Sequence, residues 1–346
     1  MQAMVLDKLY DLDKEKSPLR KADLPIPEPS ENELLIKVSA CGVCHTELDE
    51  IEGRTPPAFF PIVLGHQVVG RIVTAGKQVK KFKAGERVGV AWIYWACGKC
   101  ELCLKGSENV CTKFQGTGRD AHGGYAEYII ASQSFAYLIP EVFTDPEAAP
   151  LLCAGAIGYR ALNLSHLKNG EILGLTGFGA SGHLVLMMAQ HRFPDSPIFV
   201  FARSEQERMF ARELGAAWTG ESSDQPPEKI HAIIDTTPVW KPVLDALKNL
   251  QSGGRLVINA IRKENLDRNY LLNLDYPSHL WLEKEIKTVA NITRTDVGEF
   301  LKLAAGIPIR AEYQEYDLSE ANHALLELKQ HRIRGSKVLR MDRDFY

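Results

Sequence analysis

The sequence predicts an α/β protein in two parts, a β-rich, barrel-like domain followed by a doubly wound parallel sheet. Up to about residue 150, short β-rich runs alternate with turns marked by glycine and proline. Beyond that point, apolar strands alternate with longer helical segments, a pattern typical of a parallel sheet with crossover helices. A glycine-rich turn, G-F-G-A-S-G, directly follows the first of those strands and opens a helix.

The first domain is predicted from four β-rich runs, which indicate an antiparallel, barrel-like arrangement. They are residues 33–40, 61–73, 86–92 and 123–132. The parallel sheet is expected to contain strands at residues 171–177, 197–204, 231–237 and 253–260, with helices near residues 183–192, 205–215 and 241–250.

The last part of the chain is expected to return to the first domain, which would then be discontinuous in sequence. It contains a helix at 297–306, an extended segment, a helix at 319–332 and a last strand at 337–341. We therefore expect a first domain at residues 1–150, a nucleotide-binding domain at 151–286 and a returning segment at 287–346.

Composition favours small molecules as partners. The 346 residues correspond to about two domains of ~150 residues each. Because 41 basic residues stand against 44 acidic ones, no basic excess indicates nucleic acid or an anionic membrane. The N-terminus shows no apolar leader, and no apolar stretch approaches the ~18 residues that cross a bilayer. We therefore expect a cytoplasmic protein.

The glycine turn has the context of a dinucleotide site. Gly177 would permit the tight turn, Gly179 would let the backbone approach a pyrophosphate, and Gly182 would allow close packing of helix on strand. No carboxylate stands at the end of the second strand, where an NAD site usually offers one to the ribose. Arg203 and Ser204 stand there instead and suit a 2′-phosphate, which favours NADP(H). In the alternative, Arg203 is an ordinary surface residue, Glu205 or another group meets the ribose, and NAD(H) is used.

Four of the seven cysteines lie within fifteen residues and indicate a structural metal site. They follow the spacing C-x2-C-x2-C-x7-C, at Cys97, Cys100, Cys103 and Cys111. The segment has too few apolar residues to pack by itself, so a metal would supply the missing cross-link. An iron–sulfur run also begins C-x2-C-x2-C but continues with x3-C-P. The spacing therefore favours zinc.

Several motifs together resemble the zinc-dependent medium-chain alcohol dehydrogenases in order and spacing. They are CGVCHTEL (41–48), GHQVVG (65–70), CGKCELCLKGSENVC (97–111), LLCAG (151–155) and the glycine turn. The segment RSEQERMFARELGA (203–216) resembles the cinnamyl alcohol dehydrogenase-like branch. The resemblance implies a GroES-like barrel as catalytic domain and a Rossmann domain, with the active site in the cleft between them.

The resemblance also implies the residues of a catalytic centre. Cys44, His66 and Cys153 would bind a catalytic zinc and leave one position free. Around these ligands the resemblance implies a carboxylate that orients His66 (Glu47), a hydroxyl that begins a proton relay (Thr46), a contact to the cofactor pyrophosphate (His45) and a wall of the substrate pocket (Trp92). Tyr94 and Trp95 could serve the pocket or the core, and Cys41 is expected to be a core residue.

Three positions depart from the family pattern. Gln67 replaces the acid that many relatives carry after the histidine, which puts any ligand-exchange role of that acid in doubt. Asp49 stands where several relatives have the relay histidine, so the proton would leave through a carboxylate or bypass this residue. Ile157 replaces a threonine near the nicotinamide and suggests a more apolar contact.

The predicted activity is reversible hydride transfer between a primary or aromatic alcohol, or its aldehyde, and NAD(P), with two zinc ions per chain. Trp92, with Phe59 and Phe60 on a nearby loop, hints at apolar substrates. A homo-oligomer, dimer or tetramer, is expected by resemblance. One alternative is a polyol or sugar dehydrogenase of the same superfamily, although Cys153 argues against it. Another is a non-catalytic protein that binds zinc and nucleotides.

Overall fold

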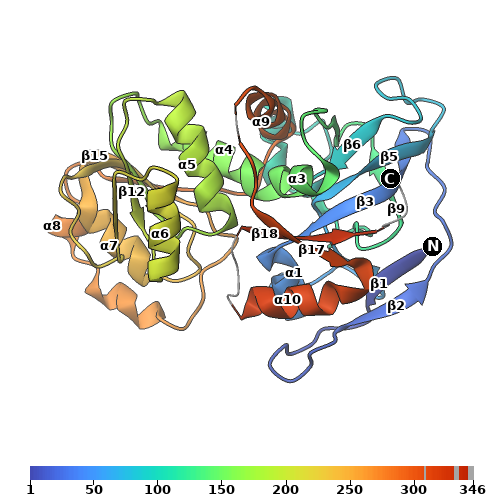
Figure 1. Ribbon diagram of the computed structural model, residues 1–346, viewed down its shortest axis with the longest axis horizontal. Helices are drawn as coiled ribbons and strands as arrows, with labels where there is room; N and C mark the ends of the chain where they lie inside the picture. The colour runs from blue at the N-terminus through green and yellow to red at the C-terminus, as the bar shows by residue number, and fades with distance from the viewer. Residues whose placement is uncertain (308, 331–334, 342–346) are drawn as a thin grey trace. The chain divides into compact units, whose positions relative to one another are not determined.

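The computed structural model describes residues 1–307, 309–330 and 335–341, and its contacts divide the chain into two compact units (Figure 1). The first unit comprises Met1–Ala156 and Ile292–Tyr346, and the second comprises Ile157–Asn291. The first unit is therefore assembled from two separate stretches of chain. The domain limits expected from the sequence, after residues 150 and 286, lie a few residues before these divisions.

The main sheet of the first unit is built around one long strand, β3 (Glu33–Val43). Strand β5 pairs antiparallel with most of β3, while β9 pairs with its first half and β18 with its second half. The order is β10-β6-β5-β3-β18-β17, with β9 joined to β3. These strands span Val68–Ala75 (β5), Arg87–Val90 (β6), Tyr128–Ser132 (β9), Ala136–Leu138 (β10), Tyr313–Asp317 (β17) and Ser336–Arg340 (β18). The returning segment thus completes the sheet.

Two smaller sheets and several helices complete the first unit. One sheet has the order β2-β1-β4 and the other pairs β7 with β8. Their bounds are Gln2–Leu6 (β1), Leu19–Asp23 (β2), Ile62–Val63 (β4), Ile93–Trp95 (β7) and Gln115–Gly116 (β8). The helical segments are His45–Ile51 (α1), Glu101–Leu104 (α2), Glu108–Val110 (η1), Asp145–Pro150 (α3), Leu151–Gly155 (η2), Arg294–Gly306 (α9), Leu318–Glu320 (η4) and Ala321–Lys329 (α10).

The apolar core of this unit joins the sheets to the helices. Ile36 on β3, Val68 on β5 and Leu325 on α10 belong to one buried cluster. Burial of such side chains stabilises the fold by about 1.5–3 kcal/mol each, as an upper estimate. Helix α10 and η4 replace the single helix expected at 319–332, whose residues 331 and 332 lie outside the described part of the chain.

The β-rich run at residues 61–73 contains β4 and the first part of β5, and a turn at Gly65 separates the two strands. Gly65 has a φ of +98°, which favours glycine, and a Cβ there would lie 2.4 Å from the ring of Tyr125. The backbone of Gly123, Gly124 and Tyr125 instead donates hydrogen bonds to the carbonyls of residues 63–65. His66 therefore leaves the strand ladder and turns towards α1.

The second unit contains a six-stranded sheet in which all neighbouring strands pair in parallel. Its order is β13-β12-β11-β14-β15-β16, so sequence neighbours diverge between β11 and β14. The bounds are Leu173–Thr176 (β11), Ile198–Phe201 (β12), Trp218–Gly220 (β13), Ile230–Asp235 (β14), Leu250–Ile258 (β15) and Glu285–Thr288 (β16). This is the strand order of dinucleotide-binding sheets. The predicted doubly wound sheet is confirmed.

The helices of this unit follow the expected alternation. They span Ala180–Arg192 (α5), Glu205–Glu213 (α6), Lys241–Asn249 (α7) and Tyr276–His279 (α8), with a 3₁₀ helix at Arg268–Asn273 (η3). Helix α4 (Ala156–Ser165), together with α3 and η2 before it, was not expected from the sequence. Among the described residues, none of the helices combines the length and the apolar character needed to span a bilayer.

Candidate metal centres and cofactor site

The turn from β3 into α1 holds Cys44 in place. The residue is extended, with φ −132° and ψ 165°, and helix α1 begins directly after it. Its backbone N–H donates to Oε2 of Glu47 over 2.8 Å, as in a helix N-terminal capping box. Glu47 is fully buried, so the hydrogen bond replaces water that the carboxylate has lost.

The second oxygen of Glu47 reaches His66. Nδ1 of His66 lies 2.6 Å from Oε1 of Glu47, and both side chains are buried. A carboxylate in this position fixes the tautomer with the proton on Nδ1 and leaves the lone pair of Nε2 free for a ligand bond. One side chain on α1 thereby joins the turn at Cys44 to the loop at His66.

Cys153 approaches from the π-helix η2, which lies between α3 and α4. A single π turn shifts the helical register, and such turns are frequent at functional sites. The sulfur of Cys153 lies 3.2 Å from Nε2 of His66. The ligand atoms of Cys44, His66 and Cys153 all lie within 4.8 Å of one another. The structure thus brings together three residues that are far apart in the sequence.

Cys44, His66, Cys153 and Glu47 lie close enough to shift one another's pKa values. The hydrogen bond with Cys153 lowers the pKa of Cys44 well below its usual value, and the same bond with burial raises the pKa of Cys153. Burial would lower the pKa of His66, but the Glu47 carboxylate and Cys44 raise it well above its usual value. Burial raises the pKa of Glu47. A divalent metal binds thiolates and a neutral imidazole, so its binding would release the protons that the raised pKa values of Cys153 and His66 retain.

The donor set fits zinc. Tetrahedral geometry with Zn–S of about 2.3 Å and Zn–N of about 2.0 Å places sulfur about 3.5 Å from nitrogen. The observed separation of 3.2 Å between Cys153 Sγ and His66 Nε2 is close to this value. Two thiolates and one imidazole are a known catalytic zinc set that leaves a fourth position for substrate.

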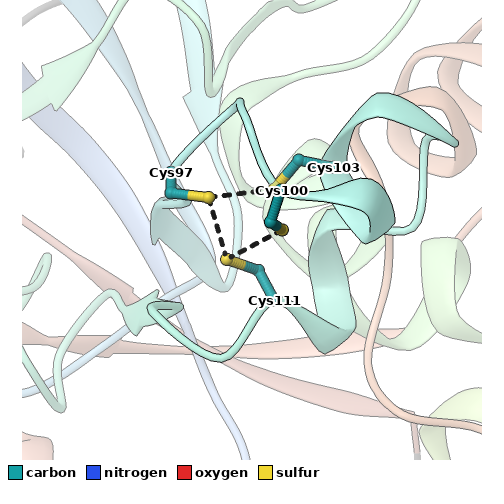
Figure 2. Close-up of side chains that lie close together, drawn as sticks. All are labelled: Cys97, Cys100, Cys103 and Cys111. Atoms are coloured by element: carbon teal, nitrogen blue, oxygen red, sulfur yellow. Dashed lines mark hydrogen bonds between the residues drawn. The ribbon is translucent and has the colours of Figure 1, made fainter.

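Residues 97–111, the four-cysteine lobe, bring four sulfurs together in the geometry of a metal site with no open coordination position (Figure 2). The sulfur separations are 3.8 Å for Cys97 and Cys103, 3.9 Å for Cys100 and Cys111, and 3.6 Å for Cys111 and Cys97. Zn–S bonds of about 2.3 Å predict sulfur separations of about 3.8 Å in a tetrahedron. Backbone N–H donors lower the pKa of Cys97 to about 6, whereas burial raises that of Cys103 to about 12. The four sulfurs fit a structural zinc.

The other residues expected around the catalytic centre occupy different environments. Thr46 is buried, and its hydroxyl lies 3.7 Å from Cys44 Sγ. The Trp92 ring meets His66 edge-on at 5.1 Å. His45 is exposed at the start of α1. Tyr94 donates to Glu33 over 3.2 Å, which engages its hydroxyl away from the metal ligands.

Gln67 and Asp49, two of the residues that depart from the family pattern, are buried against specific neighbours. Gln67 is buried, and its side chain lies against Gly42, where a Cβ would meet Gln67 Oε1 at 2.4 Å. Asp49 is also buried and accepts a 2.6 Å hydrogen bond from Nε of Arg54. Cys41 is fully buried in the apolar cluster of the first unit, as expected for a core residue. Ile157 is half-buried in α4.

Glu50 is a buried acid that sequence reasoning missed. It lies three residues after Glu47 on α1, and such spacing places both on one face of a helix. Neither of its carboxylate oxygens has a hydrogen-bond partner among the described residues. Burial, reinforced by the negative charge of Glu47, raises the pKa of Glu50 well above its usual value. The Tyr125 hydroxyl is similarly buried and without a partner in the described part of the chain.

The glycine turn of the second unit has the expected geometry. Gly177 has a φ of +84°, which glycine tolerates best. Gly179 precedes α5, and a Cβ there would meet nothing within 4 Å, so the backbone is open to a ligand. A Cβ on Gly182 would lie 2.6 Å from the carbonyl oxygen of Gly177, so only glycine allows this close approach.

The residues after β12 differ in their exposure and in their partners. The Arg203 side chain is exposed. The Ser204 hydroxyl donates to Glu207 over 2.9 Å and accepts from its backbone N–H over 3.2 Å, so it caps α6. Glu205, the acid considered for the ribose, pairs with Arg208 over 2.9 Å and also with Arg212. The pattern S-x-x-E at residues 204–207 is the sequence signal of this capping role.

Comparisons with known proteins agree with this architecture. A model of the alcohol dehydrogenase GroES-like domain matches residues 30–141. A probable alcohol dehydrogenase of Mycobacterium tuberculosis is 40% identical over 327 residues, which are 93% of this chain and 92% of the relative. An alcohol dehydrogenase of Geobacillus stearothermophilus is 32% identical over 342 residues, or 95% and 97% of the two chains. A solved cinnamyl alcohol dehydrogenase of Sorghum bicolor has a TM-score of 0.86 at 25% identity, with 98% and 97% covered.

Substituting one cysteine in each group is expected to separate the two metal sites. Cys103→Ser should remove one zinc and lower the melting temperature by several degrees, because the lobe has a small apolar cluster of its own. Cys153→Ser should also remove one zinc, but with a smaller loss of stability. The other two ligands of that site, Cys44 and His66, are held by hydrogen bonds to Glu47 whether or not a metal is bound. Elemental analysis and calorimetry measure both quantities. Fewer than two zinc ions in the unaltered protein would contradict the assignment.

Replacing Glu50 with Gln is expected to stabilise the protein above about pH 5. The folded-state pKa of Glu50 is raised, so the folded chain retains a proton that the unfolded chain releases above its pKa of 4.5. Stability is therefore lost as the pH rises from that value towards the folded pKa. Glu50→Gln should gain about 1–2 kcal/mol near pH 8, with no gain near pH 4. Urea unfolding at both pH values measures this, and an equal effect at both would contradict it.

Proposed function

Because the chain belongs to the zinc-dependent medium-chain alcohol dehydrogenase family, we propose that it transfers hydride reversibly between a primary or aromatic alcohol, or its aldehyde, and a nicotinamide dinucleotide. The chain is an NAD(P)-linked oxidoreductase of the alcohol dehydrogenase class. The observation that carries the proposal is the convergence of Cys44, His66 and Cys153, which leaves one position of a tetrahedral site for substrate.

We propose two zinc ions per chain. The first unit offers a three-ligand set and a four-cysteine set, and both have separations suited to zinc. In the three-ligand site, two thiolates would balance the charge of the divalent ion. Glu47 would hold His66 through Nδ1, so that Nε2 faces the metal. The four-cysteine set has no open position and would be structural.

Zinc would supply a Lewis acid that polarises the substrate oxygen, and the nicotinamide would donate or accept the hydride. The protein's own residues position the reacting groups. The Thr46 hydroxyl lies beside Cys44 Sγ and would hold the proton of the alcohol by hydrogen bonding. Trp92, packed edge-on against His66, would form an apolar wall next to the metal.

The apolar wall favours an alkyl or aromatic substrate over a polyol. The Trp92 ring stacks on Phe114 at 6.2 Å, and the exposed Phe59 meets His122 edge-on at 5.3 Å. Polyol or sugar dehydrogenases of the superfamily resemble this chain less at Cys153, where they commonly carry a glutamate. A polyol would also need hydrogen-bond partners for each hydroxyl group.

NADP(H) is proposed as the preferred cofactor. The exposed Arg203 side chain can bind a 2′-phosphate by charge-assisted hydrogen bonds. Glu205, the nearest acid considered for an NAD ribose, pairs with two arginines. Ser204 takes a smaller part than the sequence suggested, because its hydroxyl caps α6.

A homo-oligomer in the cytoplasm is also proposed. Strand β16 ends the sheet of the second unit, and its four residues are exposed. Exposed apolar side chains of this unit include Leu272, Leu274 and Trp281. An uncovered edge and apolar surface suit contact with a second copy, and a light-scattering mass of one chain would contradict it.

The proposed cytoplasmic location agrees with the cysteines. All seven are unpaired, as in reducing compartments.

Mixing NADPH with aromatic and aliphatic aldehydes tests the activity directly. The near-ultraviolet absorbance of NADPH should fall with the untreated protein and not with protein stripped of metal by a chelator. Restoring zinc should restore the rate. If no aldehyde in a broad panel is reduced while zinc and nucleotide still bind, the chain is a non-catalytic binding protein.

Replacing Arg203 with Asp is expected to reverse the cofactor preference. Loss of the guanidinium and gain of a negative charge should lower kcat/KM for NADPH relative to NADH by at least about tenfold. Arg268→Asp makes the same charge change at an exposed arginine of η3 and serves as the control. An unchanged NADPH to NADH ratio in Arg203→Asp would refute this role.

A further inference from the structure

Side chains tie together the carboxyl ends of neighbouring strands in the second unit. The Thr236 hydroxyl, just after β14, donates to the carbonyl of Thr176 at the end of β11 over 3.0 Å. A Cβ on Gly177 would lie 2.7 Å from the same hydroxyl. The glycine turn therefore rests directly on the loop that follows β14.

A buried ion pair continues this connection to the next strand. Lys263, in the segment after β15, donates through Nζ to the carboxylate of Asp235 at the end of β14 and to the carbonyl of Thr237 over 2.6 Å. The side chains of Lys263 and Asp235 are only 7% and 0% exposed. The other oxygen of Asp235 accepts from the Thr237 hydroxyl over 2.7 Å. One lysine thus joins the loops that follow β14 and β15.

Further contacts fix residues 259–267, the segment after β15. The backbone N–H of Glu264 donates to the carbonyl of Pro238 over 2.6 Å. Asp267 accepts from the backbone N–H groups of Trp240 and Lys241 at the start of α7, over 2.9 and 2.7 Å. This irregular segment is therefore held along its length against the loop after β14.

We propose that the Lys263–Asp235 ion pair is a positioning element of the cofactor site, which holds residues 259–267 beside the glycine turn for binding of the nicotinamide dinucleotide. The inference rests on the proposed function. In open α/β sheets, ligands bind outside the carboxyl ends at the point where the strand order reverses. That point lies between β11 and β14, and the pair is anchored at the end of β14. A segment held before binding loses less entropy when the ligand arrives.

Burial makes the two residues depend on each other. A charge without its partner at this depth is strongly unfavourable, whereas the intact pair satisfies both groups. Burial raises the pKa of Asp235, and the charge of Lys263 opposes this effect. Both acceptors of Lys263 belong to the protein, so the lysine acts by positioning the segment.

Cofactor titration of zinc-loaded, full-length variants tests the inference. Lys263→Met should weaken binding of NADPH and NADH by the same factor of about ten. The two cofactors differ in the 2′-phosphate, which is assigned to Arg203 and not to this ion pair. Zinc content should not change. Asp235→Asn, which keeps the shape of the side chain, should weaken both cofactors, and the double variant should bind no worse than the weaker single variant. Lys263→Arg should restore part of the affinity.

Arg255→Met is the matched control. Arg255 pairs with Glu285, the first residue of β16, over 2.6 Å, so this ion pair lies towards the amino end of a strand in the same sheet. It should lose stability without losing cofactor affinity. If Lys263→Met and Asp235→Asn both bind NADPH like the unaltered protein, the pair only supports the fold and the inference is wrong. If the unaltered protein binds neither cofactor, the proposed function fails and the inference fails with it.

Discussion

The proposed catalytic centre depends on the Glu47 carboxylate, which bridges two partners. One oxygen accepts from the backbone N–H of Cys44 and the other meets Nδ1 of His66. A single buried carboxylate thereby fixes a strand-to-helix turn, a histidine ring and its tautomer. Because water does not reach this side chain, neither contact can be exchanged for solvent without cost. The ligands are therefore held in place by the protein itself.

Both units contain buried acids, and these acids differ in whether their carboxylates have hydrogen-bond partners. Asp235 has a lysine and a threonine as partners, and Glu47 has a histidine and a backbone N–H. Glu50 lacks such a partner among the described residues. Its raised pKa means that the folded chain keeps this carboxyl protonated to a higher pH than usual, and loss of that proton would add negative charge near Cys44 and His66. A bound divalent cation would reduce that repulsion, so metal binding and the stability of α1 are expected to be coupled.

The sequence predicts most of the architecture, because the change from turn-punctuated β runs to alternating strands and helices is a local signal. The four cysteines of the lobe could also be found from spacing alone. Cys44, His66 and Cys153 could not, since their meeting depends on a broken strand at Gly65 and a π turn at residues 151–155; only the family resemblance indicated them. Glu50 and Lys263 were missed because burial and long-range pairing decide their importance.

The two groups of proposed metal ligands differ in what holds them before an ion binds. His66 and Cys44 are anchored by Glu47, and Cys153 lies in a helical segment between α3 and α4. The lobe sulfurs, by contrast, lie on a short helix and loops with a small apolar cluster. Such a lobe gains its rigidity from the metal, whereas the anchored site can keep one coordination position open without collapsing. An open position is what substrate binding requires, so in the proposed zinc site the hydrogen bonds of Glu47 would serve catalysis as well as stability.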